Sequence, residues 1–183
     1  ASEYKDPETN AHTQRVAYYS KLLARAYGLD DSLQDIIFYA SPFHDLGKIG
    51  IPDNILLKPG KLDAAEFEIM KKHSQIGYEI LKSSKSKYLK AGGVIAYNHH
   101  EKYDGSGYPN GLKGESIPIF GRITAIADVF DALTSARPYK KAWEIEDAFE
   151  FLIKEKGIHF DPKLVDLFLE NKNEVIEINN KFS

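Results

Sequence analysis

The segment FHDLGKIG, residues 43–50, places an imidazole beside a carboxylate, His44 and Asp45, just after an apolar pattern. In the preceding residues 32–42, leucine, isoleucine and alanine recur at intervals of three and four residues, which predicts a helix that stops near Pro42. The end of a predicted helix therefore carries two neighbouring groups that can take up a proton or bind a metal.

Six further segments show helical signals. Residues 7–27 have apolar side chains at helical spacing and stop at Gly28, and Asp63 followed by Glu66 resembles a capping box that begins another helix. The other predicted helices are residues 89–101, 120–135, 145–155 and one that begins with Asp161 as N-cap and Pro162 as its first residue. Because alternating strand patterns are few, we predict an all-α domain, a bundle of about seven helices.

A long loop is predicted between two of these helices. The stretch EKYDGSGYPNGLKGESIP, residues 101–118, is rich in glycine, proline and short polar residues, which form turns. His99 and His100 directly precede the loop. In the helix that follows it, Asp128 and Asp131 are three residues apart and so share one helix face.

The composition indicates a single folded domain over residues 1–183. With 183 residues, of which 43% are hydrophobic, the chain is long enough for one sizeable core. A net charge of -3 and a pI near 6.1 do not favour binding to nucleic-acid polymers or anionic membranes. No apolar run reaches the length of a membrane span. The chain has no cysteine, which agrees with a cytoplasmic setting and leaves imidazole and carboxylate as the metal ligands.

The chain begins at Ala1 rather than at a methionine and enters a helical pattern almost at once. This beginning is consistent with the catalytic fragment of a longer multidomain protein. We expect such a protein to carry a sensor or receiver domain upstream of the fragment.

Five of the six histidines fall on helix faces or helix ends that also carry carboxylates or small residues, and only His159 stands apart. Nitrogen and oxygen ligands without sulfur suit iron, manganese, zinc or nickel. Hydrolysis of phosphoesters commonly uses two or three such ions. The distribution of histidine and aspartate therefore favours a metal-dependent hydrolase.

Taken singly, these residues also have interpretations without a metal. His73 on an apolar helical stripe could be a hydrogen-bonded core histidine, and Glu8 with His12 could be an ordinary surface pair one helical turn apart. Asp128 could be solvated, and the two adjacent histidines could form a polar helix end. Burying all of these groups without compensating charge would be costly, however. A metal cluster removes this difficulty.

Several ordered motifs identify a resemblance. The sequence contains HDLGK at residues 44–48, HHE at 99–101, DGSGYP at 104–109 and RPYK at 137–140. It also contains IPDNILLKPGKL and ADVFDALTSARPYK at the expected places. In these motifs the chain resembles the HD-GYP phosphodiesterases, which belong to the HD superfamily of metal-dependent phosphohydrolases. The match runs over residues 8–162, so the resemblance covers most of the chain.

The resemblance implies an all-α HD fold and the hydrolysis of cyclic di-GMP to linear pGpG, to GMP, or to both. It implies two or three divalent or trivalent metal ions, most often iron or manganese. Asp45 matches a ligand that bridges two ions, and Glu8 and His12 match extra ligands of members with three metals. The full set of matching ligands is Glu8, His12, His44, Asp45, His73, His99, His100 and Asp128.

The resemblance also implies catalytic and substrate-binding residues. A metal-bridging hydroxide would attack the phosphorus, and Lys48 matches a lysine that reaches the scissile phosphate, where it could neutralise charge or protonate the departing ribose oxygen. Arg137 and Lys140 match contacts to phosphate or guanine, and a solvated helix end is the less favoured alternative. The loop residues with a matching substrate-binding position are Gly107, Tyr108 and Pro109, for which a structural turn or a partner surface is the alternative.

Other functions stay open at this point. Related HD-GYP proteins prefer a cyclic GMP-AMP dinucleotide, and the HD fold also supports simple nucleotide phosphohydrolases. A different class would be a cyclic dinucleotide sensor with little turnover, or a module that docks onto a diguanylate cyclase domain through the loop around Tyr108. The loss of a ligand residue would mark the sensor, and none of the matching ligands is missing.

Overall fold

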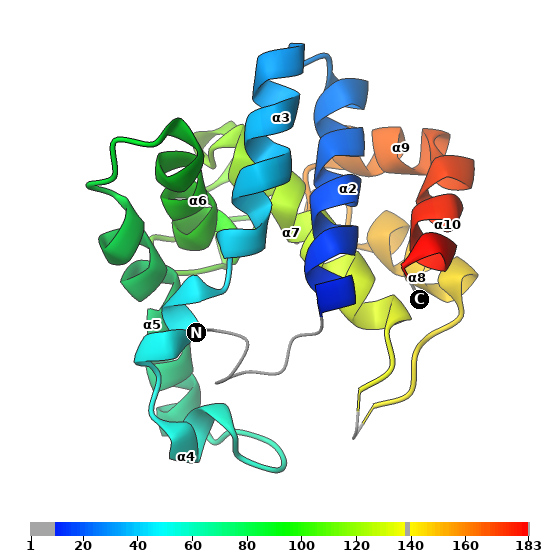
Figure 1. Cartoon of the computed structure of the whole chain (residues 1–183). Coiled ribbons are helices and arrows are strands. Elements are labelled where there is room, and N and C mark those ends of the chain that lie inside the picture. The colour runs from blue at the N-terminus through cyan, green and yellow to red at the C-terminus, as the bar shows by residue number, and fades with distance from the viewer. Residues whose placement is uncertain (1–9, 138–139, 183) are drawn as a thin grey trace.

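A computed structural model describes residues 10–137 and 140–182, which form nine α-helices, three short 3₁₀ helices and no sheet. Helices α2 and α3 run side by side, α5 and α6 lie on one flank, and α8, α9 and α10 lie on the other (Figure 1). The α-helices are α2 (Asn10–Tyr27), α3 (Asp31–Ala40), α4 (Asp53–Leu56), α5 (Ala64–Leu81), α6 (Lys87–Asn98), α7 (Ile119–Thr134), α8 (Ile145–Lys154), α9 (Pro162–Glu170) and α10 (Lys172–Lys181). The 3₁₀ helices are η1 (Ser41–Phe43), η2 (Leu46–Gly50) and η3 (Gly114–Ser116).

The predicted all-α fold is confirmed, with two α-helices more than expected in the described ranges. Helix α4 has only four residues, too few for a periodic pattern, and α10 follows α9 after the single residue Asn171, without a glycine or proline to mark the boundary. Residues 7–9 of the first predicted helix lie outside the described residues. None of the helices described has the length and apolar character to span a bilayer.

Side-chain caps set several helix ends as the sequence predicts. The Asp63 carboxylate accepts a hydrogen bond from the backbone of Glu66, whose side chain accepts one from the backbone of Asp63, so the capping box is present. Asp161 caps α9 in a similar way. Helix α6 begins at Lys87 rather than at residue 89, because the Ser86 hydroxyl caps it, and it ends at Asn98. His99 and His100 therefore lie just beyond the helix.

The hydrophobic core lies where α2, α7 and α9 cross. Tyr19 of α2, Phe130 of α7 and Phe168 of α9 are fully buried, and their rings meet edge to face with centroids 5.0 to 5.8 Å apart. Burial of one large apolar side chain contributes roughly 1.5 to 3 kcal/mol. This packing fixes α2 against α7 and so sets the distance between side chains on their facing sides.

A glycine allows the segment after α3 to lie directly on α5. A Cβ atom at Gly47 would be 1.8 Å from the carbonyl oxygen of His73 and 2.5 Å from the backbone nitrogen of Gly77. The two backbones are therefore in contact, and only glycine fits between them. As a result, Asp45, which directly precedes η2, lies beside His73 on α5.

The turn after α8 supports the long loop. The backbone nitrogen atoms of Tyr103 and Asp104 donate hydrogen bonds to the carbonyl oxygens of His159 and Ile158, at 3.0 and 2.9 Å. The His159 ring stacks on Phe160, with centroids 4.1 Å apart. Burial, assisted by the nearby Lys102 charge, lowers the pKa of His159 to about 4.

Acid is expected to destabilise the fold through His159. The unfolded chain binds this proton near pH 6.5 and the folded chain only near pH 4, so stability falls as the pH drops through this window. The expected contribution is a loss of about 2 kcal/mol between pH 7 and pH 5. Urea unfolding of metal-free wild type and His159→Gln at both pH values measures it. The variant should lose less stability on acidification, and an equal loss in both proteins would contradict the prediction.

Candidate metal centre

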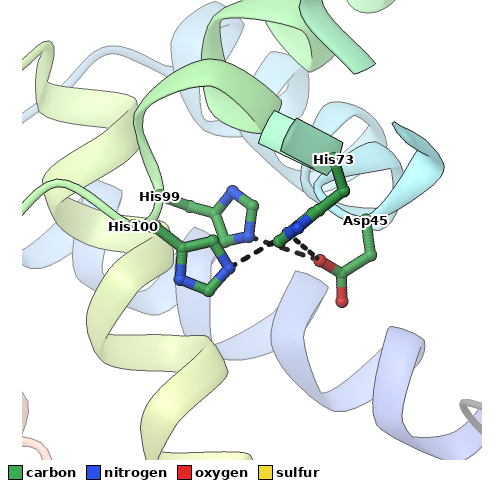
Figure 2. Close-up of side chains that lie close together, drawn as sticks. All are labelled: Asp45, His73, His99 and His100. Carbon is green, nitrogen blue, oxygen red and sulfur yellow. Dashed lines mark hydrogen bonds and ion pairs between the residues drawn. The ribbon is translucent and has the colours of Figure 1, made fainter. Parts of the chain in front are cut away.

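Four predicted ligands from three segments converge at one point of the bundle. Asp45 precedes η2, His73 lies on α5, and His99 and His100 follow α6. One donor atom from each of them lies within 4.8 Å of the others. Figure 2 shows these side chains pointing toward one another. Asp45 Oδ1 is 3.3 Å from Nε2 of both His73 and His99, and His100 Nε2 is 3.1 Å from His73 Nε2.

A second cluster adjoins the first and is formed by His12, His44 and Asp128. Asp128 Oδ1 on α7 is 3.4 Å from Nε2 of His12 on α2 and 3.3 Å from Nε2 of His44. His44 Nε2 also lies 3.2 Å from Asp45 Oδ2. The two oxygens of Asp45 thus face different clusters, which is the arrangement expected of a carboxylate that bridges two ions.

Backbone carbonyl groups orient three of the imidazoles. The Nδ1 atoms of His44 and His73 are each 2.7 Å from a carbonyl oxygen three residues earlier, and His99 Nδ1 is 3.1 Å from the carbonyl oxygens of Ile95 and Ala96. Because a carbonyl oxygen only accepts hydrogen bonds, we assign the proton to Nδ1 in each ring. The Nε2 lone pairs then face the centre, as in many histidine ligands of metals.

This orientation fits a bound cation. His99 Nε2 and Asp45 Oδ1 are buried acceptors 3.3 Å apart, and neither has a hydrogen-bond donor in the described part of the chain. Two facing acceptors repel each other unless a positive charge lies between them. Imidazole nitrogen and carboxylate oxygen without sulfur suit iron, manganese or zinc. The residues present therefore fit the metals that the resemblance implies.

The electrostatics keep the carboxylates ionised. Burial opposes ionisation of Asp45, but the Lys48 and His44 charges hold its pKa well below the usual range. Burial is likewise outweighed at Asp128, mainly by His44, so the pKa of Asp128 is also well below its usual value. Burial lowers the pKa values of His99 and His100. At His44, in contrast, burial is outweighed by the Asp45 and Asp128 charges, which raise its pKa well above the usual value, so metal binding would release a proton from His44. Ionised carboxylates and neutral imidazoles are the forms that bind metals.

Lys48 lies at the edge of the centre. Its Nζ atom is 3.3 Å from Asp45 Oδ2, and 17% of its side chain is exposed. The ammonium group is therefore held beside the bridging carboxylate and is still accessible from solvent. This is the position in which a cation could meet a phosphate group that reaches the two clusters.

The loop after His100 covers that ligand. A Cβ atom at Gly107 would be 2.3 Å from the backbone nitrogen of Lys102 and 2.4 Å from the carbonyl oxygen of His100, so glycine is needed for the close approach. The Tyr108 ring stacks on the His100 imidazole, with centroids 4.8 Å apart. Pro109 follows Tyr108 through a cis peptide bond. The structure thus gives Tyr108 a packing role against a predicted ligand.

Glu101 anchors the same loop, and the sequence analysis assigned it no role. The side chain is buried, and its two oxygens accept hydrogen bonds from the backbone nitrogen atoms of Asn110 and Leu112, at 2.7 and 2.9 Å. A glutamate directly after two histidines was the available signal. Because Glu101 closes the loop back on His100, it fixes the position of Tyr108.

The remaining predicted site residues lie outside the described residues or in the exposed segment after α7. Glu8 lies outside those residues, as do Pro138 and Tyr139 of the RPYK motif. Arg137 and Lys140 are exposed and pair through their backbones, at 2.8 and 3.0 Å, in the arm after α7. The Lys140 ammonium group donates to the carbonyl oxygen of Ala132. Their contacts with substrate stay predictions.

The described residues form an all-α bundle in which two adjoining clusters of histidine and aspartate could hold metal ions. The HD domain family model matches residues 3–164, and the chain belongs to this family.

Similar proteins of known name support the same family assignment. The chain is 57% identical to the 3'3'-cGAMP-specific phosphodiesterase 2 of Vibrio cholerae over 97% of its own length and 34% of the relative. It is 49% identical to a cyclic di-GMP phosphodiesterase response regulator of Xanthomonas campestris over 100% of its own length and 48% of the relative. The chain therefore spans about a third to a half of these proteins.

A solved structure has the same fold. The crystal structure of a cyclic GMP-AMP-specific phosphodiesterase of V. cholerae superposes with a TM-score of 0.68 over 98% of this chain and 49% of that one, at 19% sequence identity. At this identity the likeness concerns the fold. It agrees with the HD-domain architecture described above.

Proposed function

We propose that this chain is the catalytic HD-GYP domain of a phosphodiesterase that hydrolyses cyclic di-GMP to pGpG, GMP or both. The observation that carries the proposal is the pair of adjoining clusters that share Asp45, with Lys48 beside them. The named relatives support a cyclic dinucleotide as substrate. Because the chain spans only part of those relatives, an upstream sensor or receiver domain in the whole protein is part of the proposal.

The proposed ligands divide into two groups around Asp45. Asp45, His73, His99 and His100 would hold one ion, and His12, His44 and Asp128 would hold another, with iron or manganese as the proposed metals. Glu8 would complete a third position. The bound ions would supply a water molecule of lowered pKa and polarise the phosphate oxygens.

The side chains then have distinct tasks. Asp45 holds Lys48 through the 3.3 Å ion pair and keeps the ammonium group at the centre. Lys48 can neutralise charge that develops on the phosphate and donate a proton to the departing ribose oxygen. Burial, together with the Asp45 charge, raises the pKa of Tyr108, so its hydroxyl stays protonated and can donate a hydrogen bond.

The substrate needs local positive charge, because a cyclic dinucleotide carries two phosphates and the chain has a net charge of -3. Lys48 supplies one cation at the centre. We propose that Arg137 and Lys140, which lie together after the helix that carries Asp128, supply others to phosphate or guanine.

One observation favours a second candidate substrate. The relative that is 57% identical is named as specific for 3'3'-cGAMP, whereas the relative named for cyclic di-GMP is 49% identical. The two substrates differ in one base, so the same centre would serve both reactions. The choice then depends on the residues that contact the bases.

A substrate panel tests the proposal. The purified chain, loaded anaerobically with Fe(II) or Mn(II), is incubated with cyclic di-GMP, 3'3'-cGAMP or a mononucleotide, and the products are separated by chromatography. We expect cyclic di-GMP to give pGpG or GMP faster than cGAMP is cleaved, and the chelated protein to be inactive. Preferential cleavage of cGAMP would support the second candidate. Nucleotide binding without turnover by the loaded protein would overturn both in favour of a sensor.

A further inference from the structure

His12 is oriented differently from three of the other predicted histidine ligands. The rings of His44, His73 and His99 direct Nδ1 at backbone carbonyl groups. In contrast, His12 Nδ1 lies 2.6 Å from Oδ2 of Asp131, a carboxylate on α7. A negatively charged group therefore takes the place of a neutral carbonyl at this one imidazole.

The Arg15 guanidinium group positions Asp131 for this contact. Its side chain is completely buried, and its Oδ1 accepts a hydrogen bond from Arg15 Nε at 2.5 Å, while Oδ2 accepts one from Arg15 Nη2 at 3.1 Å. Arg15 also donates to the Ser135 hydroxyl at 2.9 Å and to the carbonyl oxygen of Phe182 at 2.5 Å. A buried carboxylate that is paired in two places has little freedom to move.

The four residues His12, Arg15, Asp128 and Asp131 lie on the facing sides of α2 and α7. His12 and Arg15 are three residues apart on α2, and Asp128 and Asp131 are three residues apart on α7. Residues at this spacing share a helix face. Asp131 contacts His12 at Nδ1, and Asp128 Oδ1 lies 3.4 Å from its Nε2, so the two aspartates of α7 flank the two nitrogens of one ring.

We infer that Asp131 is a positioning residue that, with its charge balanced by Arg15, fixes His12 and sets the metal affinity of the cluster formed by His12, His44 and Asp128. A carboxylate behind a histidine ligand fixes the proton on the nitrogen that faces the carboxylate and strengthens the other nitrogen as a ligand. Loss of such a partner typically lowers metal affinity 10- to 100-fold, by an order-of-magnitude estimate. The inference rests on the proposed metal centre.

The cluster of Asp45, His73, His99 and His100 serves as the internal reference. None of the contacts described for these four residues involves Asp131 or Arg15. A change at Asp131 should therefore weaken one metal site and leave the other intact. A purely structural ion pair between α2 and α7 would instead lower the stability of the fold without separating the two sites.

The test is Mn(II) binding to wild type and to Asp131→Asn. Free Mn(II) is measured by its electron paramagnetic resonance signal during a titration, and the metal content per chain is measured after desalting. We expect one class of sites to weaken 10- to 100-fold and the other to keep its wild-type affinity. The exposed Asp166→Asn on α9 is the matched control and should bind as wild type does. If both classes of sites in Asp131→Asn had the same Mn(II) affinities as in wild type, the inference would be overturned.

Two further variants separate a positioning role from a failure to fold. In Arg15→Met/Asp131→Asn both buried charges are removed together, so no unpaired arginine is left, and the same single class of sites should weaken. In a double-mutant cycle with His12→Gln, Asp131→Asn should cause no further loss, because it acts through His12. Additive losses would overturn the inference. If wild type bound no Mn(II) at all, the proposed metal centre itself would be wrong.

Discussion

Asp45→Asn is expected to lose at least one metal ion per chain and to lower kcat for cyclic di-GMP on the order of 10³-fold. Asp45 is the carboxylate whose two oxygens face the two clusters, at 3.2 to 3.3 Å from His44, His73 and His99. An amide of the same shape carries no negative charge and binds a cation weakly. Metal analysis of the purified protein and a steady-state assay measure both effects.

Asp35→Asn provides the control for Asp45→Asn. Asp35 lies on α3, its side chain is 56% exposed, and it pairs with Lys21 on the surface. Its replacement should leave metal content and kcat unchanged. If Asp45→Asn retained the wild-type metal content and rate, Asp45 would have neither of its proposed roles.

Lys48→Met is expected to lower kcat on the order of 10² to 10³-fold while the metal content stays at the wild-type value. Methionine keeps the length and packing of the side chain but removes the ammonium group, which lies 3.3 Å from Asp45 Oδ2. The loss should fall on kcat more than on KM, because charge at the phosphate and on the departing oxygen grows in the transition state. Steady-state kinetics of the loaded enzyme separate the two constants.

The outcome for Lys48→Met distinguishes catalysis from assembly of the centre. Lys82→Met, at the exposed end of α5, is the matched control and should retain wild-type kinetics and metal content. A loss of metal in Lys48→Met would make Lys48 a support for Asp45 rather than a catalytic residue. Unchanged kcat would remove it from the mechanism altogether.

Much of the fold was predictable because its signals are local. The capping box at Asp63 and Glu66 and the cap at Asp161 each involve residues close together in the chain, and both are present in the structure. Apolar spacing likewise located the helices that carry His73 and Asp128. Helix α4 and the boundary before α10 were missed because a single turn has no period and a break of one residue leaves no pattern.

The candidate site was predictable in its residue types but not in its connections. Histidine, aspartate and the absence of cysteine indicated the kind of metal ligands, and the resemblance named the positions. The sequence places Glu101 directly after two histidines, but it did not indicate that Glu101 would hold the loop or that Tyr108 would stack on His100. These contacts depend on how a loop folds back on itself, which no periodic pattern encodes.

By itself, the sequence determined the all-α class, most helix boundaries and the set of groups that can bind a metal, because each depends on residue type and on spacings of a few residues. Only the tertiary structure decided that these groups form two clusters that meet at Asp45. It also decided that Asp131, rather than solvent, lies behind His12. The physical reason is that residues 116 to 119 positions apart, such as Arg15 or His12 and Asp131, are brought together by the burial of the apolar core between α2 and α7.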